Sequence, residues 1–130
     1  MVKNHQQSDN FSFKKRIKSF SYAFKGIFYM MSTQHNFWIQ IIMGLLAVFL
    51  GLVLNINRFE WGLVVLSCGM VLTAETFNSA IEALADAVNP EYDSKMGLIK
   101  DLAAGAVLIS AIAAAIVGLL IFIPKIIMFL

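Results

Sequence analysis

The stretch GLVVLSCGMVLTAETFNSAIEALAD, residues 62–86, decides the expected fold of this chain. Its first half is apolar, and its second half carries four polar residues at positions i, i+3, i+7 and i+11: Glu75, Asn78, Glu82 and Asp86. On an α-helix this spacing places the four side chains on one face. Ionised groups in such an apolar helix are costly and usually face a cavity or a partner. The stretch therefore predicts a membrane helix with a buried polar site; the alternative is the solvent-facing end of an amphipathic helix.

The composition of the whole chain is typical of an integral membrane protein. Of its 130 residues, 59% are hydrophobic and 14% are charged, and the mean hydropathy is +0.77. Soluble domains are roughly 45–50% apolar and about 25% charged. The net charge of +2 gives no indication of a nucleic-acid partner, and we expect none. Residues 1–10 are polar and lack the apolar segment of a cleaved signal peptide.

The order of apolar and polar segments predicts an all-α integral membrane protein with three transmembrane helices. Each apolar stretch is close to the ~20 residues that a helix needs to cross a bilayer. Asn89-Pro90 is expected to end the second span, and Pro124-Lys125 the third. We expect a single membrane domain over residues 1–130, with an interfacial helix at 11–33 and transmembrane spans at 37–55, 60–88 and 98–123.

The basic residues of the chain indicate its orientation. Residues 11–33 mix lysines and an arginine with aromatic side chains, which predicts an amphipathic helix on an anionic leaflet. The alternative is a basic juxtamembrane segment that only sets the topology. Eight of the ten Lys and Arg residues lie before residue 26 or between residues 89 and 101. The positive-inside rule therefore places the N-terminus, Asp86 and the second loop in the cytoplasm.

The polar face of residues 75–86 offers groups that suit phosphoryl transfer. No G-x-x-x-x-G-K-[ST] or G-x-G-x-x-G motif occurs, so a metal, lysines and side-chain donors would have to hold a nucleotide. Two glutamates with Asn78 between them suit a magnesium site plus a base, because hard cations prefer carboxylate and amide oxygens. Lys100-Asp101 adds a cation and an anion on the same side; the alternative is a helix start whose acid stabilises the dipole.

The stretch from Glu75 to Asp86 resembles the signature of the prokaryotic diacylglycerol kinases, a family of integral membrane lipid kinases that includes undecaprenol kinases. Only Phe77 and Ala85 depart from it, where aliphatic residues are usual. Residues 100–107, KDLAAGAV, and Lys25-Gly26 resemble two further blocks of the family. The resemblance covers about residues 12–125. It implies a homotrimeric bundle with active sites between protomers, in the bacterial inner (cytoplasmic) membrane, with the active site on the cytoplasmic side.

The resemblance also implies roles for individual residues. Glu75 is similar to the general base that takes the proton of the lipid hydroxyl, and Glu82 resembles a ligand of Mg²⁺. Asn78 and Ser79 match positions that line the site. Contacts with ATP are implied for seven further residues: Lys15, Lys18, Tyr22, Asp86, Tyr92, Lys100 and Asp101. For Lys15 and Lys18, attraction to lipid head groups is the alternative.

Gln34 is the one departure that bears on the metal. Residues 33–36, TQHN, match a block that often reads TERN in the family, and its glutamate helps to hold the metal. Gln34 keeps an oxygen ligand but lacks the charge. We therefore expect Gln34 to be a weaker ligand of Mg²⁺; the alternative is that the site recruits another carboxylate.

Two functions of different classes fit these features. The first is a lipid kinase that transfers the γ-phosphoryl group of Mg-ATP to the hydroxyl of diacylglycerol or undecaprenol. The second is a small oligomeric transporter or ion pathway lined by Glu75 and Glu82. The basic N-terminal helix and Lys100-Asp101 favour the kinase, because a pore needs neither. A purely structural membrane subunit would leave Glu75 without a role.

Overall fold

The described part of the chain is all-helical. The structure, a computed structural model, describes residues 12–91 and 93–129. Four helices follow one another: α1 (Phe13–Thr33), α2 (His35–Val53), α3 (Arg58–Val88) and α4 (Ser94–Phe129). Three of them, α2, α3 and α4, are long and apolar enough to cross a membrane. The protein is therefore a helical membrane protein, as the sequence predicted.

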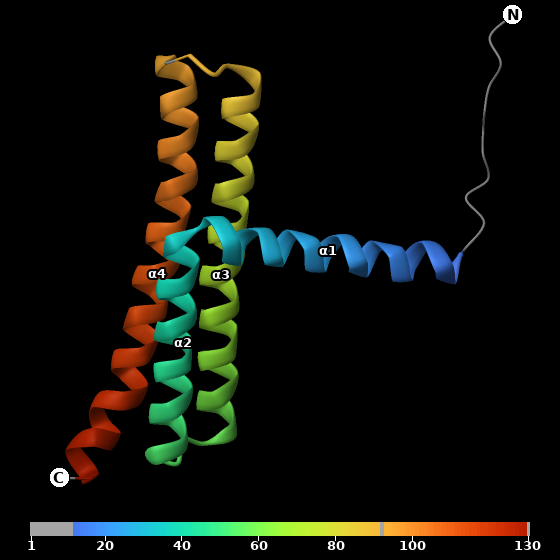
Figure 1. The fold of residues 1–130 in the computed structure, drawn as a ribbon. Helices are drawn as coiled ribbons and strands as arrows, with labels where there is room; N and C mark the ends of the chain where they lie inside the picture. Colours follow the sequence, from blue (N-terminus) through green and yellow to red (C-terminus); the bar gives the residue numbers. More distant parts are fainter. Residues whose placement is uncertain (1–11, 92, 130) are drawn as a thin grey trace, which may run out of the picture.

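Helices α2, α3 and α4 run antiparallel to their chain neighbours and form one bundle, whereas α1 leaves it at a steep angle (Figure 1). Helix α3 packs mainly against α4, and α2 lies against the first half of α3. The second half of α3 and the first half of α4 extend beyond the start of α2. The 31 residues of α3 span roughly 46 Å at about 1.5 Å per residue, more than the ~30 Å of a bilayer core. One end of α3 must therefore emerge into water.

The turn between α2 and α3 is fixed by local interactions. Asn57 caps α3 because its side chain accepts a hydrogen bond from the backbone of Glu60, whose carboxylate accepts one in return. A Cβ at Gly51 would lie 2.8 Å from the Trp61 ring, so only glycine allows this close approach. Asn55 takes the left-handed conformation that asparagine tolerates, with φ of 49°. These features set α2 and α3 side by side.

The core of the bundle lies near this same end. Its buried members, Ile56, Val64, Ile121 and Phe122, join the α2–α3 turn to the last third of α4. Lys125 forms an ion pair with Glu60 at 3.2 Å, which links the end of α4 to the start of α3.

Helix α4 corrects one expectation from the sequence. Pro124 was expected to end the third helix, but the helix continues through it to Phe129. A proline removes one backbone hydrogen bond, and helices in apolar surroundings tolerate this loss where neighbouring groups compensate. At the other end, α4 begins at Ser94, ahead of the predicted start of the span at 98. Helix α3 ends at Val88, where Asn89-Pro90 was expected to stop it.

Candidate active site on helix α3

Glu75 lies in the middle of the bundle and is only 2% exposed. It comes from the second half of α3, at the level where α2 begins. The side-chain amide of Gln40 on α2 donates a hydrogen bond from Nε2 to Glu75 Oε2 at 2.9 Å. A buried carboxylate without a partner would be strongly destabilising, so this contact across two helices is significant. The other oxygen of Glu75, Oε1, accepts no hydrogen bond from the described residues, and Glu75 lines a cavity.

Asn78 makes a second hydrogen bond between an amide and a carboxylate one turn further along, this time within α3. Its Nδ2 donates to Glu82 Oε1 at 3.0 Å, and its side chain is buried while that of Glu82 is partly exposed. Each of the two glutamates therefore accepts a hydrogen bond from a neighbouring amide group.

Several buried oxygen atoms near these two hydrogen bonds have no hydrogen-bond partner. Among the residues that the structure describes, three buried side-chain atoms have no hydrogen-bond partner: Gln40 Oε1, Asn78 Oδ1 and Ser79 Oγ. A buried acceptor without a donor costs roughly 1–3 kcal/mol. Their grouping around Glu75 and Glu82 indicates a site that receives donors or a cation from a ligand.

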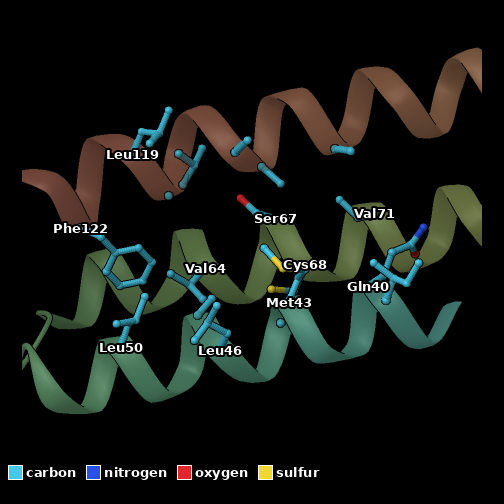
Figure 2. A pocket seen from close by; sticks show the side chains of 18 of the residues that line it. Gln40, Met43, Leu46, Leu50, Val64, Ser67, Cys68, Val71, Leu119 and Phe122 are labelled. Atoms are coloured by element: carbon cyan, nitrogen blue, oxygen red, sulfur yellow. The ribbon is translucent and has the colours of Figure 1, made fainter. Parts of the chain in front are cut away.

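Two cavities meet at Gln40. The smaller cavity, of about 320 Å³, is lined largely by apolar residues of α2 and α4, but it also contains four polar side chains, those of Asn36, Gln40, Glu75 and Asn78. We call it the polar cavity after these side chains. An apolar cavity of about 640 Å³ lies between α4 and the α2–α3 pair, with Gln40 at one end and Phe122 at the other (Figure 2). Ile39, Gln40 and Ala111 line both cavities. An amphipathic molecule could thus place an apolar tail in one cavity and a polar head beside Glu75.

The far end of the polar face carries an ion pair between helices. Lys100 Nζ on α4 contacts Asp86 Oδ1 on α3, and the carboxylate of Asp86 is 66% exposed. Exposed pairs of this kind contribute little stability, so the lysine can exchange partners. Asp101, the next residue of α4, is exposed. The structure therefore brings Asp86 and Lys100 together where α3 ends and α4 begins.

The residues predicted on α1 lie apart from Glu75 within one chain. Lys18 lies over the ring of Tyr22 at 5.9 Å and Lys25 over the same ring at 5.8 Å, so these groups gather on α1 itself. Figure 1 shows the N-terminal part of α1 pointing away from the bundle, and Lys15 is in that part. Gln34 is partly buried at the junction of α1 and α2. Tyr92 lies outside the described residues.

The oxygen atoms present suit a magnesium ion in kind. Glu82 supplies a carboxylate, and Asn78 Oδ1 is a buried amide oxygen without a donor. Within residues 12–91 and 93–129, no three acidic, histidine or cysteine side chains come together as a metal site. Magnesium is usually held in proteins by one or two carboxylates together with waters and substrate phosphates.

Gln40 is the site residue that the sequence did not identify. The available signal was a single polar side chain near the start of an otherwise apolar span. Its partner Glu75 is 35 residues away, and one sequence contains no information that pairs them.

Comparison with known proteins points to one family. The sequence model of the family described as prokaryotic diacylglycerol kinase matches residues 21–122. An undecaprenol kinase of Bacillus subtilis is 32% identical over 123 residues, which cover 95% of this chain and 97% of that protein. A diacylglycerol kinase of Escherichia coli K12 is 34% identical over 80% of this chain and 85% of its own length. A diacylglycerol kinase of Synechocystis is 36% identical over 82% of this chain, and the match spans 61% of that protein.

Proposed function

This chain belongs to the prokaryotic diacylglycerol kinase family and is a lipid kinase, and from that premise we propose that it transfers the γ-phosphoryl group of Mg-ATP to the hydroxyl of a membrane lipid. The observation that carries the proposal is the buried carboxylate of Glu75 at the junction of a polar and an apolar cavity. A lipid that accepts a phosphoryl group fits such a junction, because its tail is apolar and its reactive group is a hydroxyl.

Glu75 is proposed as the general base. Its free oxygen, Oε1, accepts the proton of the lipid hydroxyl while the hydroxyl oxygen forms a bond to the γ-phosphorus. The bond between that phosphorus and the β–γ bridging oxygen breaks, and ADP leaves with the electron pair. Positioning and charge stabilisation supply most of the rate in phosphoryl transfer.

The nucleotide is proposed to bind beyond Glu75, toward the water-facing end of α3 and α4. Glu82 and Asn78, with Gln34 as a weaker ligand, would hold Mg²⁺, which neutralises charge on the phosphates. Lys100 and Asp101 would contact ATP, and Asp86 would lie near it. The exposed ion pair between Lys100 and Asp86 supports this arrangement, because its lysine can turn to a phosphate at low cost.

A homotrimer is proposed as the functional state, in line with the family resemblance. An exposed stripe on α3 supports it: spacings of four and three residues alternate along Leu66, Met70, Thr73, Phe77, Ala80, Leu84 and Ala87. This is the heptad spacing with which helices supercoil, and small residues among the larger ones let membrane helices approach closely. The stripe lies away from Glu75, so copies of α3 can pack together without blocking either cavity.

The trimer would also bring α1 of a neighbouring copy into reach of the site. Lys15, Lys18 and Tyr22 belong to α1, which points away from the bundle in its own chain (Figure 1), so contacts with ATP would come from a neighbouring copy or from movement of α1. Basic and aromatic side chains are exposed along α1, which supports a helix lying on the cytoplasmic leaflet of the inner membrane.

The experiment that tests the function is transfer of labelled phosphate from ATP in detergent micelles with Mg²⁺. Diacylglycerol and undecaprenol are offered side by side. Labelling of one lipid and not of the other supports the proposal and shows whether the chain is of the diacylglycerol kinase or the undecaprenol kinase type. Absence of label in both, with a folded oligomer that binds ATP, would overturn the proposed substrates. Absence of ATP binding would overturn the kinase itself and favour a transporter.

A further inference from the structure

We infer that Gln40 is a positioning residue of the phosphoryl-transfer reaction, which fixes the carboxylate of Glu75 so that one oxygen faces the lipid hydroxyl. The inference rests on the proposed function and deepens it. It assigns a task to a side chain on α2 that carries no recognised motif.

The first observation is the hydrogen bond itself. Gln40 Nε2 donates to Glu75 Oε2 at 2.9 Å, and it is the one hydrogen bond that the structure gives to this carboxylate within the described residues. A carboxylate on a flexible side chain has several rotamers, each of which aims its oxygens differently. An amide bonded to one oxygen selects one of them and leaves the other oxygen, Oε1, for the substrate.

The second observation is that Gln40 acts from a separate helix. Glu75 lies on α3, and Gln40 lies 35 residues earlier on α2. Helices α2 and α3 are held at a fixed distance by the turn in which Gly51 contacts Trp61. The amide is therefore supplied by a rigid neighbour, which is the arrangement that keeps a reacting group within the small tolerance of a productive geometry.

The third observation is the place of Gln40 between the two cavities. It lines the apolar cavity as well as the polar one, so a lipid that reaches Glu75 from the apolar side passes beside it. Its carbonyl oxygen, Oε1, is buried without a donor in the same region. A hydroxyl that arrives at the junction can donate to this oxygen before its proton passes to Glu75. Gln40 thus has one group for the base and one for the incoming alcohol.

The test replaces Gln40 with methionine, which has a similar length and no donor. We expect kcat for lipid phosphorylation to fall on the order of tenfold to a hundredfold, the range for losing one hydrogen bond to a charged group. The KM for ATP should change less than about twofold, because the proposed nucleotide site lies beyond Glu75, toward Asp86 and Lys100. Oligomeric state and thermal stability in detergent are measured alongside.

The matched control is Thr76→Val. Thr76 adjoins Glu75 in sequence, but its side chain is exposed and donates only to the carbonyl of Leu72 in its own helix. This variant also loses one side-chain hydrogen bond, and its kcat should match that of the unchanged protein.

A double substitution separates positioning from a structural role. In Glu75→Asp the carboxylate is one methylene shorter and no longer reaches the amide of Gln40. Adding Gln40→Met to that variant should then cost less than about twofold in kcat, because the contact is already lost. An equal cost in both backgrounds would overturn the inference, and so would an unchanged kcat in Gln40→Met alone. If the unchanged protein phosphorylates no lipid at all, the proposed function fails instead.

Discussion

Replacement of Glu75 with glutamine should remove the proposed general base and leave the rest of the site intact. Glutamine has nearly the shape of glutamate, and its carbonyl oxygen can accept the Gln40 amide where Oε2 does now, at 2.9 Å. The cavity keeps its volume and its hydrogen bond, and only the proton acceptor is lost. General-base catalysis contributes about 10²- to 10⁴-fold, so we expect kcat to fall by that factor, or roughly 3–5 kcal/mol in the barrier.

The assay for this variant measures initial rates of lipid phosphorylation in micelles together with ATP binding at equilibrium. Glu60→Gln is the matched control, since it makes the same chemical change on the same helix. Glu60 pairs with Lys125 at the start of α3, several helical turns before Glu75. A glutamine there can still accept the hydrogen bond of the helix cap. The control should therefore keep its full kcat.

Two results would refute the reasoning about Glu75. A variant that keeps more than a tenth of the original kcat would show that another group takes the proton. Loss of ATP binding in a correctly assembled oligomer would show that Glu75 serves the nucleotide and not the lipid hydroxyl.

Four further substitutions test other parts of the structure. Glu82→Gln should raise the Mg²⁺ concentration for half-maximal rate by about tenfold or more, because a charged ligand is lost; an unchanged magnesium titration would count against a metal role. Gln34→Glu should lower that concentration, and no shift in the same titration would show that residue 34 is not a ligand of the metal. Gly51→Ala should destabilise the protein by about 1–3 kcal/mol in thermal or denaturant unfolding, because the new Cβ would lie 2.8 Å from Trp61; unaltered stability would contradict the tight turn. Leu84→Lys should break up the oligomer by placing a charge on the exposed α3 stripe, as measured by light scattering, and an intact trimer would exclude that stripe as its interface.

The sequence predicted the helices well because their signal is local. The apolar lengths and the i, i+3, i+7 spacing depend only on neighbouring residues, so three candidate spans and a polar face on α3 could be read from one chain. Glu75 and Asn78 are buried on that face, as the cost of ionised groups in apolar helices implied.

The remaining features depend on packing between distant segments. The contact between Gln40 and Glu75 joins two helices, and the meeting of two cavities needs α4 as a third wall. The path of α4 through Pro124 was predicted wrongly, because the local cost of a proline was weighed without the surroundings that offset it.

The apolar cavity between α4 and the α2–α3 pair bears on which concentration of the lipid substrate determines the rate of the enzyme. Its walls belong to helices that can cross a membrane, so we expect its contents to exchange with the hydrocarbon of the bilayer and not with bulk water. A lipid substrate then arrives by diffusion in two dimensions, while ATP arrives in three. The rate should follow the mole fraction of substrate among the surrounding lipids, and adding inert lipid at constant total substrate should slow turnover. An enzyme whose two substrates are both dissolved in water would show no such dependence of its rate on added lipid.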